Sequence, residues 1–244
     1  MNINPGNYWP LGSTIQKSFQ IPQPNHPYYL KYGYISVNPT NGLTVLVYRK
    51  GNLDSGDSGT IFMNISKDGG ANFQQEQIIY GPITNFDCRN IAGGYDSNGV
   101  LYVFFAKWDL IHSNYTSINY LYSPDDGNTW SIDYILPNLN NTTFSPYGHI
   151  IDVGINNLGC NTLYQTWYGD DSTNYSLYLY KSIDSGVSFT LTNIITIYQS
   201  TNNICIEPSM VNVGGGCFLV LARIVGGTSF YQFKSEDNCN TWGV

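Results

Sequence analysis

The stretch Ser66-Lys67-Asp68-Gly69-Gly70-Ala71-Asn72-Phe73 decides the fold, because its pattern returns three times further along the chain. The copies start at Ser123, Ser182 and Ser235, at spacings of 57, 59 and 53 residues, and the last copy replaces only the glycine. A repeat of this period is typical of a propeller or a solenoid. The motif residues are Ser66, Asp68, Gly70 and Phe73; Ser123, Asp125, Gly127 and Trp130; Ser182, Asp184, Gly186 and Phe189; and Ser235, Asp237 and Trp242.

Each residue type of the motif suits a tight hairpin turn. The aspartate can accept backbone N–H groups, the glycine tolerates a positive φ, and the aromatic ring can pack between sheets. The motif therefore indicates a structural turn and not a catalytic site.

Alternating strand patterns surround each turn. A strand such as 60–65 or 176–180 precedes the motif, and two earlier strands are joined by a glycine-containing turn, so one period has room for four strands. This organisation predicts blades at approximately 30–80, 86–137, 147–198 and 204–244 within one domain spanning 1–244.

The motif resembles the Asp-box, or bacterial neuraminidase repeat, of the sialidase superfamily of β-propellers. The resemblance implies an all-β propeller of four-stranded antiparallel blades. We favour a ring of four blades, closed by an N-terminal strand at 12–22, because closure removes free sheet edges. The alternative is part of a six-bladed, sialidase-like propeller, which would leave one blade face exposed unless chains associate.

Composition limits the partners of the chain. A net charge of −7 and only 10 Lys and Arg residues argue against nucleic acid. No apolar run approaches the roughly 20 residues of a membrane helix, and the N-terminus lacks the features of a signal peptide. We expect no membrane insertion, no cofactor and no metal, and cysteines that are mostly buried. The composition allows either a monomer or an oligomer, and we expect the protein to be extracellular or at a virion or cell surface.

The chain contains three arginines, Arg49, Arg89 and Arg223, all expected near the propeller axis on one face. Guanidinium groups in a concave site are suited to bidentate capture of a carboxylate. The alternative is that each arginine pairs with an internal acid, for example Arg89 with Asp87 or Arg223 with Glu207.

Two segments resemble the sialidase active site. The segment 207–223 is similar to the one that begins with the catalytic glutamate and ends with an arginine of the substrate-binding triad. The loop 52–57 resembles the loop of the acid/base aspartate, which implies a role for Asp54 or Asp57. The Arg-Ile-Pro motif is replaced by Tyr32-Gly33-Tyr34, and no tyrosine nucleophile is identified.

These patterns predict carbohydrate recognition at the axial face, of an acidic or hydroxyl-rich sugar. The first alternative is a glycoside hydrolase of sialidase-like type, with Glu207, Asp54 and Asp57 as candidate catalytic residues. The second is a non-catalytic structural or assembly module, which requires a large apolar contact. The expected ligand contacts are Arg49, Arg89, Arg223, Asp87, His149, Trp167 and Tyr32.

Overall fold

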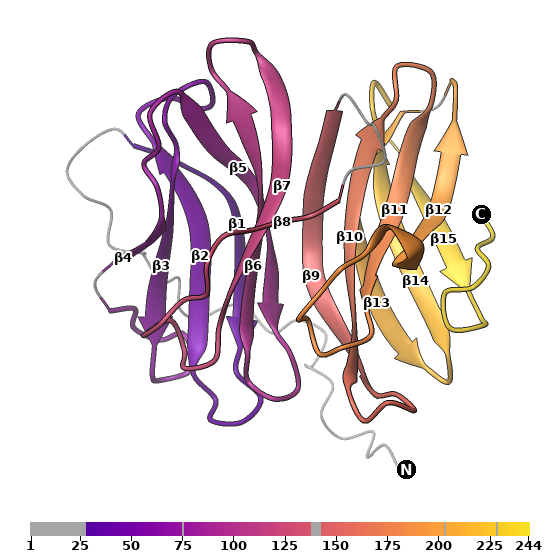
Figure 1. Cartoon of the computed structure of the whole chain (residues 1–244), viewed down its shortest axis with the longest axis horizontal. Helices are drawn as coiled ribbons and strands as arrows, with labels where there is room; N and C mark the ends of the chain where they lie inside the picture. The colour runs from indigo at the N-terminus through magenta and orange to yellow at the C-terminus, as the bar shows by residue number, and fades with distance from the viewer. Residues whose placement is uncertain (1–27, 75, 138–142, 203, 228) are drawn as a thin grey trace, which may run out of the picture.

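The computed structural model describes residues 28–244 except 75, 138–142, 203 and 228. Within these residues the chain is all-β, with fifteen strands and one short 3-10 helix, η2 (Leu191–Asn193). The predicted N-terminal strand at 12–22 lies outside the described residues. Figure 1 shows the strands as upright, curled sheets.

The strands form four successive blades. Blade 1 contains β1 (Tyr29–Val37), β2 (Thr44–Gly51), β3 (Thr60–Ser66) and β4 (Gln77–Tyr80). Blade 2 contains β5 (Phe86–Tyr95), β6 (Leu101–Asp109), β7 (Asn114–Ser123) and β8 (Tyr134–Ile135). Blade 3 contains β9 (Thr143–Ile155), β10 (Asn161–Asp170), β11 (Tyr175–Ser182) and β12 (Ile194–Ser200), and blade 4 contains β13 (Cys205–Gly214), β14 (Cys217–Ile224) and β15 (Phe230–Ser235).

Every blade is an antiparallel meander whose strands pair in chain order. The first strands of blades 2 and 3 also approach each other, with a parallel pair between Gly93 and His149 that joins the two sheets. The first strand of each blade is therefore the innermost one, and side chains that this strand presents converge toward the middle of the molecule.

The four Ser-x-Asp turns share one hydrogen-bond arrangement. In the first, Ser66 Oγ accepts the Gly70 N–H at 2.8 Å and donates to Asp68 Oδ1 at 2.7 Å, and Asp68 Oδ1 also accepts the Asn72 N–H at 2.8 Å. The equivalent bonds recur at Ser123, Ser182 and Ser235. Two of the motif glycines lie against the preceding blade, since a Cβ on Gly127 would stand 2.2 Å from Met63 Cε and one on Gly186 would stand 2.3 Å from Tyr102 Oη.

Three hydrophobic clusters lie between the four blades. The first contains Val47 of blade 1 and Val103 of blade 2, the second Phe104 of blade 2 and Leu163 of blade 3, and the third Leu179 of blade 3 with residues of blade 4. The aromatic residues of the turns join these clusters; the Phe189 ring meets the Phe104 ring edge-on at 5.5 Å. Face-to-face packing of consecutive sheets thus builds the core.

The blades follow one another in a half-barrel, with blades 1 and 2 on the left of Figure 1 and blades 3 and 4 on the right. Among the described residues, β13 packs on blade 3 and not to any comparable extent on blade 1. A closed ring would bring blades 1 and 4 together. The described residues therefore form a half-barrel and not the closed four-bladed ring that the sequence favoured.

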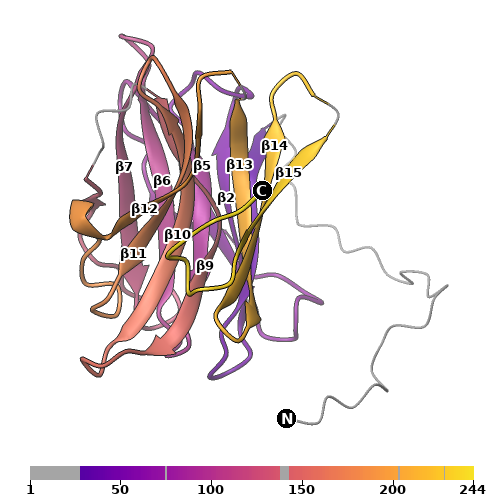
Figure 2. The same ribbon diagram turned by 90° about the vertical axis from the view of Figure 1, so that its right-hand side faces the viewer.

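Blade 4 consequently has one covered face and one open face. The covered face contributes Val220 and Phe233 to the third cluster, whereas Leu221 and Phe230 on the open face are 50% and 67% exposed. Figure 2 shows β14 and β15 at one side of the molecule, beside the C-terminus. The equivalent faces of blades 1 to 3 are each covered by the next blade.

The remaining sequence expectations concern cysteines and membrane helices. All five cysteines are free; Cys88, Cys205 and Cys239 are buried, and Cys160 and Cys217 are half-buried. In the part of the chain that the structure describes, no helix has the length and apolar character needed to cross a membrane.

Two leucines on adjacent blades test the difference between the covered and open faces. Leu179 is fully buried between blades 3 and 4, so Leu179→Ala is expected to lower the free energy of unfolding by about 2–5 kcal/mol. Leu221→Ala on the open face should lower it by less than about 1 kcal/mol. Urea unfolding measures both. Equal losses would show that the open face is covered in solution, as an assembly module requires.

The Ser-x-Asp turns also predict acid sensitivity. Hydrogen bonds from serine and asparagine at Asp68, and from threonine and serine at Asp237, lower the pKa of each carboxyl to about 2. An aspartate in the unfolded chain has a pKa near 3.9, so the unfolded state binds more protons between these values. We therefore expect the free energy of unfolding to fall as the pH falls from about 4 to about 2.

The double variant Asp68→Asn/Asp237→Asn is the control for this acid effect, because asparagine cannot take up the proton. Urea midpoints measured between pH 2 and pH 5 should depend less steeply on pH in the variant. An unchanged slope would mean that other carboxyls control acid unfolding.

Candidate functional site

A cavity of about 570 Å³ opens where the first strands of all four blades converge. Its polar lining comes from Tyr32, Tyr34, Tyr147, His149, Glu207 and Ser209, and its apolar lining includes Ile35, Leu46 and Ile91. We call this cavity the axial pocket. A mixed lining of aromatic, apolar and a few polar side chains is usual for small-ligand sites.

A repeated backbone irregularity shapes the axial pocket. The innermost strand of every blade carries a register shift. At each shift one residue has a left-handed backbone; these residues are Tyr32, Asn90, Gly148 and Glu207, with φ of 53°, 55°, 77° and 57°. A bulge redirects side chains, and left-handed non-glycine residues are strained conformations that cluster at functional sites. The bulges therefore direct Tyr32 and Glu207 into the pocket lining.

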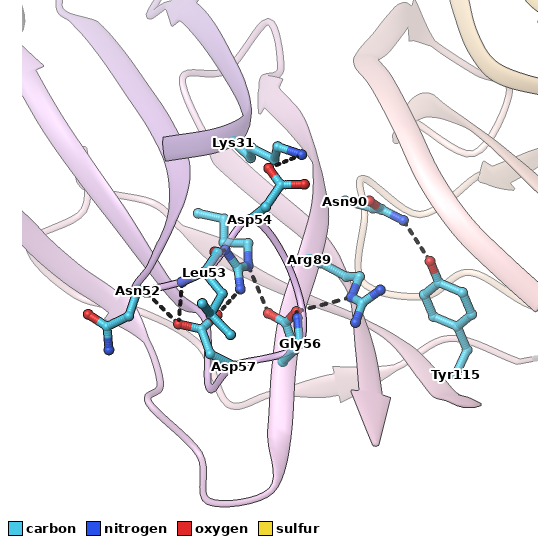
Figure 3. A network of polar contacts seen from close by, with 11 residues as sticks. Lys31, Asn52, Leu53, Asp54, Gly56, Asp57, Arg89, Asn90 and Tyr115 are labelled. Carbon is cyan, nitrogen blue, oxygen red and sulfur yellow. Dashed lines mark hydrogen bonds and ion pairs between the residues drawn. The ribbon is translucent and has the colours of Figure 1, made fainter. Parts of the chain in front are cut away.

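Arg49 lies inside the protein and not in the pocket. Its Nε donates to Asp87 Oδ1 at 2.8 Å, its Nη1 donates to the Leu53 carbonyl at 3.1 Å, and its Nη2 donates to Asp57. Figure 3 shows Asp57 in turn held by Asn52 and Leu53. The arginine, fully buried, thus ties the loop after β2 to blade 2.

The glycines flanking this network make room for it. A Cβ on Gly51 would stand 2.6 Å from Asp57 Oδ1, and a Cβ on Gly59 would stand 2.3 Å from Asp87 Oδ1. The two close approaches explain why the loop begins and ends with glycine.

Arg89 shares the carboxylate of Asp87, with 3.2 Å between Nε and Oδ2. Its guanidinium lies over the Trp108 ring at 4.4 Å and its side chain is 12% exposed. Nearby, Asn90 donates to Tyr115 Oη at 3.1 Å and to Ser145 Oγ, which continues the polar contacts from blade 2 to blade 3. Arg89 is therefore enclosed by an acid and two aromatic rings.

Glu207 and Arg223 form the polar centre of blade 4. Arg223 Nε donates to Glu207 Oε2 at 2.6 Å and Nη2 donates to Oε1 at 2.9 Å, a bidentate pair. The hydrogen bonds to Glu207 raise the pKa of Arg223. Arg223 is 41% exposed, the largest exposure of the three arginines.

Two further titratable groups that line the pocket, His149 and Tyr147, are uncharged near neutral pH. Burial lowers the pKa of His149, whose ring meets Tyr34 edge-on at 5.8 Å. Burial, with a smaller contribution from Glu207, raises the pKa of Tyr147 to about 12. Both groups can therefore exchange hydrogen bonds with neutral hydroxyls.

The structure separates the residues predicted from the sequence. Tyr32, His149 and Glu207 line the axial pocket. Arg49, Asp87 and Trp167 are fully buried, so a ligand cannot touch them, which corrects the expectation of ligand contacts there; Trp167 stacks on Tyr178 and Tyr180 at 4.6 Å. Two carboxylates lie outside the pocket lining: Asp54, exposed and paired with Lys31, and Asp57.

Tyr147, Ser209 and Asn90 were not predicted as site residues. Tyr147 precedes Gly148, the one glycine among the four left-handed bulge residues, and that glycine was the available sequence signal. Asn90 and Ser209 lie within strands, and nothing in the sequence around them distinguishes them from other polar strand residues. Within the described ranges, no group of three His, Cys, Asp or Glu side chains is arranged to hold a metal ion.

Comparison with known proteins identifies the fold. No protein-family model and no curated sequence matches the chain. A Hadza microbial sialidase superposes with a TM-score of 0.69 at 15% identity, over 88% of this chain and 46% of its own. A protein of unknown function from Dyadobacter fermentans gives 0.75 at 16%, over 90% and 69%.

A leech intramolecular trans-sialidase, solved with 2,7-anhydro-Neu5Ac, gives a TM-score of 0.68 at 11% identity, over 88% of this chain and 50% of its own. The chain thus spans about half the length of the two sialidase-type structures. At these identities the likeness concerns the fold, and this chain has a sialidase-like, all-β propeller fold.

A matched pair of variants tests the two roles assigned to arginine. Arg49→Met leaves the buried Asp87 without its main partner and should lower the free energy of unfolding by about 3–5 kcal/mol. Arg223→Met breaks a partly exposed pair and should lower it by about 1 kcal/mol or less. Chemical denaturation at neutral pH compares them, and a small loss for Arg49→Met would contradict its structural role.

Proposed function

We propose that the chain is an Asp-box propeller that recognises a glycan, acidic or hydroxyl-rich, in the axial pocket. The observation that carries this proposal is the convergence of four bulged inner strands on a pocket lined by tyrosines, His149, Glu207 and Ser209. Aromatic rings can stack on the C–H faces of a sugar, and the hydroxyl, imidazole and carboxylate groups can bind its hydroxyls. Structural neighbours that act on or bind sialic acid derivatives support a carbohydrate ligand.

A second candidate is a sialidase-like glycoside hydrolase. The resemblance implies a glutamate that activates a tyrosine nucleophile, and Glu207 shares the pocket with Tyr147 and Tyr32. Against this candidate, both carboxylate oxygens of Glu207 accept hydrogen bonds from Arg223 and none from a tyrosine among the described contacts. Turnover of fluorogenic glycosides, lost in Glu207→Gln, would favour the hydrolase over the binding module.

A pair of tryptophan variants on β13 tests the pocket itself. Ser209 lines the pocket and is exposed, so Ser209→Trp should fill the cavity without unfolding the blade and should weaken glycan binding at least about tenfold. Val211 lies two residues further on the same face of the strand but outside the pocket lining. Val211→Trp should change the affinity less than about twofold.

A glycan array followed by calorimetry on the best ligands measures these affinities, and thermal melting checks that both variants fold. Equal binding by the two variants would place the ligand elsewhere. Absence of binding to every glycan would remove the proposed function.

A further inference from the structure

Every arginine of the chain already has a carboxylate partner inside the protein. Arg49 is held by Asp57 and Asp87, Arg89 by Asp87, and Arg223 by Glu207. The first two have little or no exposed surface, so they cannot offer a guanidinium fork to a ligand in the axial pocket. Arg223 is the most exposed of the three; it does not itself line the axial pocket, but it is paired with Glu207, which does.

The N–H groups of Arg223 that could bind a ligand carboxylate already donate to Glu207. The Nε and Nη2 groups of Arg223 both donate to Glu207, at 2.6 and 2.9 Å, which is the bidentate geometry that a ligand carboxylate would need. A carboxylated sugar would have to displace Glu207, and the displaced carboxylate would then lie unpaired beside the ligand's negative charge. Like charges at this distance repel, so the exchange is unfavourable.

The other residues that line the axial pocket provide no positive charge to stabilise a bound anion. Burial lowers the pKa of His149, so its ring is neutral at pH 7, and burial raises the pKa of Tyr34 and Tyr147, which keep their protons. The chain as a whole carries a net charge of −7, which disfavours the approach of an anion. Neutral hydroxyls, by contrast, match the tyrosine and serine O–H groups and the oxygens of Glu207.

We infer that the axial pocket selects neutral, hydroxyl-rich sugars over carboxylated ones, because Glu207 occupies the place on Arg223 that a ligand carboxylate would take. This inference rests on the proposed carbohydrate-binding function and narrows it. Glu207 would then be a specificity-determining residue, because its carboxylate binds Arg223 in the way that the carboxylate of an acidic sugar would.

Matched sugar pairs test the inference in the wild-type protein. Methyl galactoside against methyl galacturonoside, and N-acetylneuraminic acid methyl ester against the free acid, differ only at the carboxylate. Calorimetry or ligand-observed NMR should give at least tenfold tighter binding of the neutral member of at least one pair, and that neutral binding should depend little on salt. Tighter binding of the carboxylated members would overturn the inference while leaving carbohydrate binding intact.

A charge variant provides the second arm. Glu207→Gln should free the Arg223 fork and shift the preference at least tenfold toward the carboxylated members. Glu236→Gln is the control, because Glu236 is also an acid paired with a base on blade 4 but lies outside the pocket, and it should leave the preference unchanged. An unchanged preference in folded Glu207→Gln would overturn the inference, and failure of the wild type to bind any sugar would overturn both the inference and the proposed function.

Discussion

The face-to-face packing of consecutive sheets is the constraint on which the rest of this structure depends. In β6, Val103 faces blade 1 and Phe104 faces blade 3, so both faces of the strand are buried from Leu101 to Ala106, and this part of the strand contains no charged residue. A close approach between blades falls at Gly94 of blade 2, where a Cβ would stand 3.1 Å from Ser36 Oγ of blade 1 and 3.5 Å from His149 Nδ1 of blade 3. The φ of 137° at Gly94 and these two neighbours favour glycine where the inner strands of three blades meet.

The same packing brings the four inner strands together and so creates the axial pocket. A regular strand would present alternate residues to the neighbouring blades and few to the centre. The bulges change this, because the left-handed residue in each inner strand turns the following backbone. Strain at Tyr32 and Glu207 is tolerated because the neighbouring sheet, blade 2 for Tyr32 and blade 3 for Glu207, holds each strand in register. The pocket is thus a consequence of the blade packing combined with one irregularity repeated in each blade.

Sequence reasoning located the turns and strands well because the Ser-x-Asp motif combines specific hydrogen bonds with a fixed spacing. It gave the pairs Arg89–Asp87 and Arg223–Glu207 as an alternative, and the structure contains both, but it did not predict that Arg49 is buried. Arg49 and Arg223 occupy equivalent positions, each on the second strand opposite the residue five before the motif serine. Arg49 is buried because Asp57 and Asp87 reach it from a loop and from the next blade, whereas Arg223 pairs within its own blade. The sequence repeat predicts the strand position of each arginine, but it does not predict which acidic residues from other loops and blades lie next to it.

The three arginines have different surroundings, and this difference affects which ligands a pocket on this fold can bind. Within this chain two guanidinium groups serve the contact between blades 1 and 2, where Asp87 receives both Arg49 and Arg89. These two guanidinium groups are enclosed, and of the third pair Glu207 lines the axial pocket while Arg223 lies beside it. Glu207 and Arg223 neutralise each other and leave tyrosine rings and hydroxyls as the dominant surface. A sialidase-like fold can therefore hold its arginines in internal ion pairs, and the fold alone does not decide which ligand its pocket binds.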